Sequence, residues 1–214
     1  MIANIDELYE ALKEVMDDKK WWNTDNLWEI MIGAILVQNT NWRNVDYSLQ
    51  NIQSEVGFLP EKILLLEDQE LEKLIRPSGF YKNKSQTIKR LLKWLKAYNF
   101  DLEAVAAIDS SKLRKLLLEI KGIGYETADV LLVYVFKKSA FIADKYAQRL
   151  FQCLGIEEHL NYQKLQNMIP WSETYTSEAA QNFHGWIVDY GQQYLKNKEL
   201  WETGPLSTFT LKII

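Results

Sequence analysis

The sequence predicts an all-α protein. Across its 214 residues, apolar side chains recur every three or four positions, as in amphipathic helices, and no segment shows the strict alternation that is typical of strands. Hydrophobic residues make up 47% of the chain, which is enough to build a sizeable core. The longest apolar runs, such as Leu131–Phe136, are far shorter than the roughly 20 residues that span a bilayer, so no membrane segment is expected.

The helices are expected between breaks where glycine, proline, asparagine, aspartate or paired charges interrupt this spacing. The pattern indicates about ten helices with short connections, and it is clearest at 27–35, 71–75 and 88–95. Residues 201–214 are not assigned by periodicity. The breaks fall at 22–25, 57–60, 77–79, 99–101, 122–124, 137–140, 155–157 and 170–172.

The chain has one cysteine, Cys153, which excludes an intramolecular disulfide and any cysteine-rich zinc or iron-sulfur site built from this chain alone. We therefore expect no metal and no cofactor. Because Cys153 lies among apolar residues of a predicted helix, we expect it to be a buried thiol. The amino terminus is acidic where a signal peptide needs basic residues, so a cytoplasmic protein is expected.

The net charge of −4 is unevenly distributed along the chain. Residues 73–149 contain 16 lysines and arginines against 7 aspartates and glutamates, whereas the remaining residues contain 9 against 22. A basic segment of this kind is typical of a face that binds phosphates, because phosphate binding depends on local charge. Charge alone slightly favours ordinary solvated helix surfaces over a phosphate-binding face.

The segment that says most about function is a turn between two predicted helices at 112–137. The turn reads Lys121-Gly122-Ile123-Gly124, in which the glycines permit positive φ and leave no side chain in the way of a close ligand. Ile123 is expected to point inward. Backbone amides at the start of the second helix then favour an anion such as a DNA phosphate. Such a contact positions a duplex without reading its sequence.

The turn and its surroundings resemble the signature of the helix-hairpin-helix (HhH-GPD) DNA glycosylases related to endonuclease III. The similarity lies in the run LEIKGIGYETAD at 118–129 and in Asp144, which follows Gly124 by twenty residues. It extends backward to LVQNT at 36–40 and to GFYKNK at 79–84, in the order expected for that family. The resemblance implies an enzyme that flips a damaged base out of duplex DNA and cleaves its glycosidic bond.

Two departures from the family pattern bear on the reaction. Relatives that also cut the DNA strand carry a nucleophilic lysine two residues after the second hairpin glycine, but this chain has Glu126 there, and a carboxylate cannot form an imine. The resemblance thus implies a monofunctional enzyme that uses water. The four-cysteine cluster loop of the family is also missing, and residues 171–214 stand in its place.

Where the chain departs from the endonuclease III pattern, it resembles the cluster-free 3-methyladenine DNA glycosylases. The similar segments are the Trp21-Trp22 pair, QNTNW at 38–42, Asp144-Lys145-Tyr146 and NFHG at 182–185. Those enzymes remove alkylated purines, whose positive charge favours stacking on aromatic faces. Trp22 and Trp42 are the candidates for stacking, and core packing explains either one equally well.

The resemblance also gives other residues candidate roles. Asp144 would stabilise the positive charge that develops on the sugar and orient the attacking water, and it would also cap the following helix. Gln38 would fill the gap left by the flipped base, or it would only cap a helix end. His184 is either a core residue or part of the base pocket. The expected contacts to DNA are Gln38, Lys121, Gly122, Ile123, Gly124, Thr127, Lys145 and Arg149.

The expected architecture has two helical domains. One is a helical barrel at 25–138 that holds the hairpin, and the other joins residues 1–24 to 139–214. The expected partner is double-stranded DNA with a damaged base, bound by a monomer associated with the nucleoid. Two other functions remain open: a glycosylase and lyase that uses Lys121 or Lys145 as the amine, and a DNA-binding protein that keeps the hairpin without catalysis.

Overall fold

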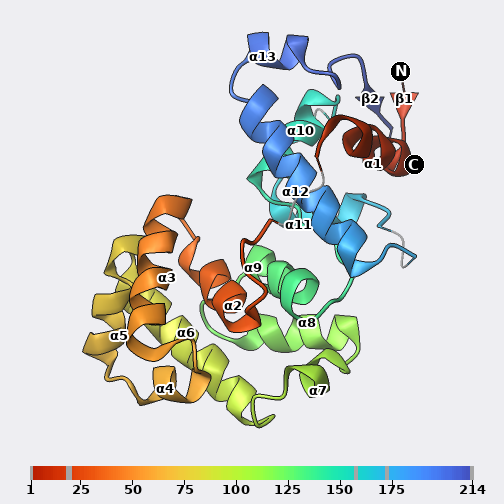
Figure 1. The fold of residues 1–214 in the computed structure, drawn as a ribbon. Helices are drawn as coiled ribbons and strands as arrows, with labels where there is room; N and C mark the ends of the chain where they lie inside the picture. Colours follow the sequence, from red (N-terminus) through yellow and green to blue (C-terminus); the bar gives the residue numbers. More distant parts are fainter. Residues whose placement is uncertain (1, 18–20, 157–158, 172–173, 213–214) are drawn as a thin grey trace. The chain divides into compact units, whose positions relative to one another are not determined.

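The computed structural model describes residues 2–17, 21–156, 159–171 and 174–212. These residues form thirteen α-helices, a 3-10 turn, a π-helical turn and one pair of two-residue strands (Figure 1). The prediction of an all-α chain is therefore confirmed. None of the described helices is long and apolar enough to cross a membrane.

The chain divides into two compact units. We call Thr24–Lys137 the hairpin unit, and Met1–Asn23 together with Lys138–Ile214 the terminal unit. The helices of the hairpin unit are α2 (Leu27–Leu36), α3 (Trp42–Val56), α4 (Pro60–Leu65), α5 (Asp68–Leu74), η1 (Arg76–Ser78), α6 (Tyr81–Lys96), α7 (Leu102–Ala106), α8 (Ser110–Glu119), α9 (Tyr125–Val130) and η2 (Leu131–Val135).

Helix α2 is the central helix of the hairpin unit. Every residue from Ile30 to Leu36 is buried, and α2 packs against α3, α6, α9 and η2. A helix that is covered on all sides needs apolar residues around its whole circumference, and the sequence of α2 meets this need. The end of α2 therefore has a fixed position, and Gln38 follows it by two residues.

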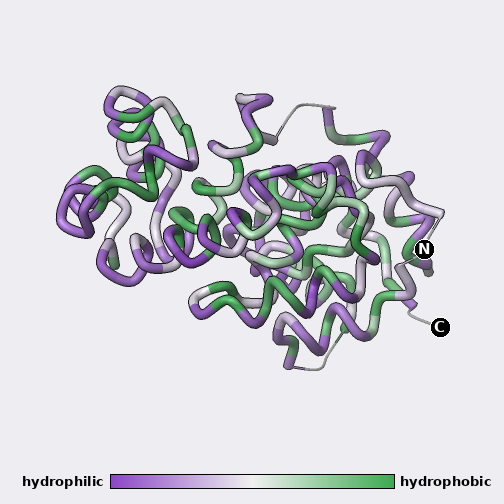
Figure 2. The backbone as a smooth tube through the Cα atoms, turned by 90° about the horizontal axis from the view of Figure 1, so that it is seen from below, coloured by the Kyte–Doolittle hydropathy of each residue, from purple (hydrophilic) through white to green (hydrophobic). Residues whose placement is uncertain are grey.

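Polar residues that directly precede helices act as helix caps. The side chain of Asn26 accepts hydrogen bonds from the backbone amides of Trp28 and Glu29 at the start of α2, and Asp109 accepts one from Lys112 at the start of α8. Such a cap satisfies amides that have no partner within the helix. Along the backbone of the chain, hydrophobic and hydrophilic segments follow one another at short intervals (Figure 2).

The terminal unit has its own hydrophobic core. Its elements are β1 (Ile2–Ala3), α1 (Ile5–Val15), α10 (Lys145–Cys153), α11 (Tyr162–Met168), α12 (Ser177–Tyr194), α13 (Lys198–Thr203) and β2 (Thr210–Leu211). Helix α12 packs against α1, α10 and α13, and aromatic rings fill much of the space, among them Trp171 stacked on Tyr175 at 4.5 Å. The unit thus builds a packed core from aromatic side chains.

The carboxyl-terminal segment closes this unit, which periodicity alone did not reveal. Strand β2 pairs in parallel with β1, and the amide of Leu211 donates to the carbonyl of Leu154 at 2.8 Å. Leu206 and Leu211 are buried in the core. The segment therefore joins the two ends of the chain within one unit.

Cys153 corrects one expectation, because its side chain is exposed rather than buried. The buried stripe of α10 runs through Ala147, Leu150 and Phe151 to Leu154. Successive residues of a helix are rotated by about 100°, so a residue next to Leu154 can leave that stripe.

Candidate functional site

The predicted hairpin is present between α8 and α9. Ile120 ends α8, and the amide of Ile123 donates to the carbonyl of Ile120 at 2.9 Å, which closes the turn. Ile123 is buried, as expected of a side chain that points inward. Gly124 occupies the N-cap position of α9 and brings no side chain to it. The backbone of the turn therefore reaches the surface without a covering side chain.

The two hairpin glycines differ in the reason for their presence. Gly122 has a φ of +103°, which L side chains rarely adopt, and a Cβ atom there would collide with the side chain of Thr87 in α6. Gly124 has a φ of −94° and no heavy atom near the position of a Cβ. Both glycines permit positive φ, but only Gly122 adopts it. The extended backbone of Gly124 suits any residue, so only Gly122 is required by the fold.

Two residues of α6 contact the backbone of the hairpin turn. Thr87 lies against Gly122, and the guanidinium Nη1 of Arg90 donates to the carbonyl of Lys121 at 3.2 Å. Both residues lie on the same face of α6, three positions apart. The backbone of the turn is thus held by a helix that is distant in sequence.

Gln38 also contacts the hairpin. Its amide Nε2 donates to Thr127 Oγ1 at 2.9 Å and to the carbonyl of Gly122 at 3.4 Å. These bonds join the end of α2 to the turn and to the first turn of α9. In this structure the amide group of Gln38 is bound to protein, so filling a gap in DNA would require these two bonds to break.

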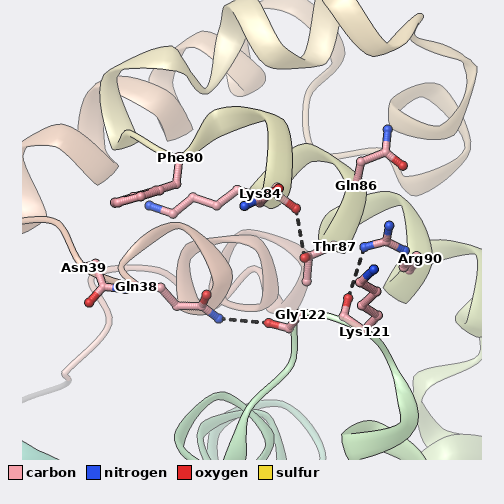
Figure 3. A pocket seen from close by; sticks show the side chains of 10 residues that line it. Gln38, Asn39, Phe80, Lys84, Gln86, Thr87, Arg90, Lys121 and Gly122 are labelled. Atoms are coloured by element: carbon pink, nitrogen blue, oxygen red, sulfur yellow. Dashed lines mark hydrogen bonds between the residues drawn. The ribbon is translucent and has the colours of Figure 1, made fainter.

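A cavity of about 430 Å³ opens beside the hairpin within the same unit (Figure 3). Basic and amide side chains dominate its lining, and none of its lining residues is acidic. The lining residues are Gln38, Asn39, Phe80, Asn83, Lys84, Gln86, Thr87, Arg90, Lys121 and Gly122. A cavity of this composition suits an anionic, hydrogen-bonding ligand.

Phe80 is a residue to which the sequence analysis gave no role. Its ring is 67% exposed at the rim of this cavity, and its φ of 46° lies in the left-handed region. Left-handed φ values cost energy in residues other than glycine, which makes Phe80, at the edge of a cavity, a candidate functional residue. The signal in the sequence was an aromatic residue placed directly after the turn glycine Gly79.

The difference between the two glycines leads to a first prediction. Gly122→Val should destabilise the hairpin unit by about 2 kcal/mol or more, because it combines a strained φ with a collision in a packed region. The free energy of unfolding of Gly124→Val should lie within about 0.5 kcal/mol of the wild-type value, since the backbone and surroundings of Gly124 accept a side chain. The new side chain would nevertheless cover the amides of α9 and weaken duplex binding about tenfold.

Thermal unfolding and duplex titration at two salt concentrations measure both effects. Wild-type affinity in a folded Gly124→Val protein would show that the start of α9 does not contact DNA.

In the terminal unit, Asp144 and His184 come together from α10 and α12. Asp144 is the N-cap of α10, and its Oδ1 accepts a hydrogen bond from the amide of Ala147 at 2.8 Å. Its Oδ2 lies 3.6 Å from Nε2 of His184, and both residues are 8% exposed. Asp144 therefore has one oxygen that serves the fold and a second oxygen that faces an imidazole. Both interpretations of this residue remain compatible with its geometry.

The predicted base-pocket residues lie in different parts of the chain. Trp22 is buried in the terminal unit, and its neighbour Trp21 packs edge to face with His184 at 5.5 Å between ring centroids. The sequence analysis gave Trp22 a stacking role and gave Trp21 none. Trp42 begins α3 in the hairpin unit and is partly buried.

The remaining predicted contacts are surface residues with distinct surroundings. Lys121 and Lys145 are exposed. Arg149 donates through Nη1 to the carbonyl of Leu195 at 3.0 Å, so it caps the end of α12. Glu126, at the position where related lyases carry an amine, is exposed in the first turn of α9. Among the described residues, no cluster of histidine, cysteine and carboxylate side chains could hold a metal ion.

Comparison with known proteins yields a consistent set of similarities. The family model of the HhH-GPD superfamily of base excision DNA repair proteins matches residues 32–173. The chain is 32% identical over 208 residues to a protein of Methanocaldococcus jannaschii that is provisionally named a DNA repair glycosylase. That alignment covers 96% of this chain and 94% of the relative.

Two solved structures extend the similarity to the fold. One is the crystal structure of a Helicobacter pylori 3-methyladenine DNA glycosylase bound to 1,N6-ethenoadenine. It matches this chain with a TM-score of 0.73 and 29% identity, and the match covers 89% of this chain and 98% of the Helicobacter pylori chain. A trapped covalent intermediate of endonuclease III with DNA has a TM-score of 0.74 at 21% identity, covering 93% and 90% of the two chains. The second likeness concerns the fold alone.

Proposed function

Because the chain belongs to the HhH-GPD superfamily of base excision DNA repair proteins, we propose that it is a monofunctional DNA N-glycosylase that releases alkylated purines from duplex DNA. The coarser part of this statement, a DNA glycosylase that binds DNA, follows from its relatives. The monofunctional reaction and the alkylated substrate are the proposal.

The observation that carries the proposed reaction is the pairing of a buried carboxylate with an imidazole. Asp144 keeps Oδ2 within 3.6 Å of His184 Nε2 while Oδ1 caps α10. Base release leaves positive charge on the deoxyribose, and a fixed carboxylate in a partly dry site stabilises such charge strongly. The same oxygen is suited to orient or deprotonate a water molecule. The helix cap limits the motion of the carboxylate and thereby pre-organises it.

Glu126 supports the monofunctional reaction. A lyase needs an amine that attacks C1′ and forms a Schiff base, and the exposed side chain at this position is a carboxylate. With water as the nucleophile, the product is an intact abasic site.

The alkylated substrate is supported by two features. The similar Helicobacter pylori enzyme is described as a 3-methyladenine DNA glycosylase, and its structure contains an alkylated adenine derivative. This chain has Trp21, Trp22 and Trp42 as candidate stacking surfaces, and a purine that carries positive charge binds the face of an indole through cation–π attraction. We expect the protein to act as a monomer associated with the nucleoid.

One experiment tests substrate and reaction together. Duplexes with alkylated, oxidised, deaminated or mismatched bases are incubated with the purified protein, and products are resolved with and without alkali. We expect release of alkylated purines, strand breaks only after alkali, and no adduct after borohydride.

Three other outcomes contradict parts of the proposal. Release of only oxidised or mismatched bases would overturn the substrate. Efficient borohydride trapping that disappears on replacing Lys121 or Lys145 would establish the lyase alternative. DNA binding without release of any base would favour the non-catalytic alternative.

A further inference from the structure

Lys84 is a lysine that the fold buries almost completely. Its side chain comes from α6 (Figure 3) and is 3% exposed. Its Nζ donates hydrogen bonds to the carbonyls of Leu36 at 2.8 Å and Ser78 at 2.7 Å. Leu36 is the last residue of α2, and Ser78 is the last residue of η1. Carbonyl groups at helix ends carry partial negative charge, which an ammonium group complements.

The two carbonyls that Lys84 holds lie next to two residues of the cavity. Gln38 follows Leu36 by two positions and bonds to the hairpin through Thr127. Phe80 follows Ser78 by two positions, and its exposed ring lies at the cavity rim. One ammonium group thus fixes the backbone that carries both side chains.

Lys84 also belongs to a row of α6 side chains that surround the cavity. Lys84, Thr87 and Arg90 lie three residues apart on one helix face, and each contacts the backbone of another segment at the cavity. Lys84 holds the ends of α2 and η1, whereas Thr87 and Arg90 support the hairpin. This face of α6 is therefore the common support of every element at the cavity.

The charges around Lys84 are mainly positive. Arg90 and Lys121 line the same cavity, and η1 adds Arg76, whose guanidinium lies over the ring of Tyr81. The acidic residue of α5 that pairs with α6 is Asp68, which is bound to Lys89 at 2.6 Å.

The other charged side chains of α4 and α5 are mostly exposed. Glu61 and Lys62 of α4 are exposed, as are Glu70 and Lys73 of α5, whereas Glu72 is partly buried. Burial lowers the pKa of Lys84 from 10.5 to about 8. An approaching anion would stabilise its charged form.

We propose that Lys84 is a positioning residue for duplex binding, which holds the ends of α2 and η1 so that Gln38 and Phe80 are presented beside the hairpin, and whose ammonium charge adds to the affinity for DNA. The inference rests on the proposed function in that duplex DNA is bound at the hairpin. It does not depend on which base is released.

The charge of Lys84 should couple DNA affinity to pH with a characteristic sign. DNA phosphates favour the charged form, so the pKa rises on binding, and affinity falls as the pH increases from about 7 through 8. The free energy of unfolding depends on pH with the opposite sign. Because the pKa of Lys84 in the folded protein is about 8 and lies below the ordinary lysine value of 10.5, the unfolded chain holds more protons between these values. The contribution of Lys84 to stability therefore increases with pH in that window.

The experiment measures the affinity of wild type, Lys84→Met and Lys84→Gln for an undamaged duplex between about pH 7 and 9.5. Lys82→Met is the matched control, because Lys82 is exposed on the same helix two positions earlier. We expect wild-type and Lys82→Met affinities to fall about five- to tenfold over this range, the loss due to one group whose pKa rises by about one unit on binding. The two Lys84 variants should bind more weakly than the wild type at pH 7 by at least a similar factor, because they lose both the charge and the bonds to the two carbonyls, and their affinity should change little with pH.

Thermal unfolding at each pH separates the effect of the Lys84 charge on DNA binding from a purely structural role. A purely structural role would lower the melting temperature of the Lys84 variants without changing the pH profile of binding. Equal pH profiles for wild type and Lys84→Gln would overturn the proposal. If neither variant folds, an affinity of the wild type that stays constant from pH 7 to 9.5 would overturn it as well. A wild-type protein that binds duplex DNA with this profile but releases no base would contradict the proposed reaction and leave Lys84 in its role.

Discussion

Replacing Asp144 with asparagine is expected to reduce base release by a factor of about 100 or more while the protein still folds and binds duplex DNA. The change removes the negative charge of a carboxylate that is 8% exposed. Stabilisation of positive charge on the sugar depends on that charge, and it is strong where little water is present. The loss should therefore appear in the rate of the chemical step, measured by single-turnover release from a duplex that wild type processes.

The fold should tolerate this substitution because asparagine caps helices about as well as aspartate. Its side-chain oxygen can still accept the hydrogen bond from the amide of Ala147 that begins α10. Asp101→Asn is a matched control, since Asp101 caps α7 through the amides of Glu103 and Ala104. The control should keep full activity. Asp144→Asn with a release rate within a few-fold of wild type would mean that Asp144 is only a helix cap.

The helices could be predicted from the sequence where local patterns determine them. Asn26 directly follows the predicted break at 22–25 and caps α2, because a short polar side chain after a connection satisfies free amides whatever the rest of the chain does. Short helices such as α4 and α7 give no clear period, since six or five residues make fewer than two turns. The pairing of β1 with β2 depends on residues more than 200 positions apart, which no local pattern reveals.

The sequence pointed to some residues of the candidate site but not to the contacts between them. The spacing from Gly124 to Asp144 identified the carboxylate, whereas the position of His184 beside it depends on the packing of α12 on α10. Lys84 was the least predictable residue. Within a basic segment it is expected to be solvated, yet the fold places its Nζ against two helix ends. Burial of a lysine depends on carbonyl partners that sequence spacing does not reveal.

The second large effect is expected on stability, from breaking the ion pair between Arg114 and Asp129. Arg114 of α8 donates through Nε to Oδ1 of Asp129 at 2.6 Å and through Nη2 to Oδ2 at 2.9 Å. Its guanidinium also lies over the ring of Tyr125, 5.4 Å from the centroid. The pair thus joins the two helices of the hairpin on either side of the turn. A two-bond arginine–carboxylate contact of this kind also fixes their relative orientation.

Arg114→Met should lower the free energy of unfolding by about 3 kcal/mol, because it leaves the charge of Asp129, whose side chain is fully buried, without its arginine. For a chain of this size, such a loss corresponds to a decrease in melting temperature of roughly 6–12 °C.

Lys115→Met is the matched control, since Lys115 is an exposed cation on the same helix, and its loss should change stability by less than about 0.5 kcal/mol. Adding Asp129→Asn to Arg114→Met should restore part of the lost stability, because the second change removes the uncompensated charge. Unfolding by heat and by denaturant measures all four proteins. A melting temperature of Arg114→Met equal to that of Lys115→Met would show that the pair contributes little to the hairpin, and that the packing of Ile123 and the support from α6 are sufficient to hold the turn.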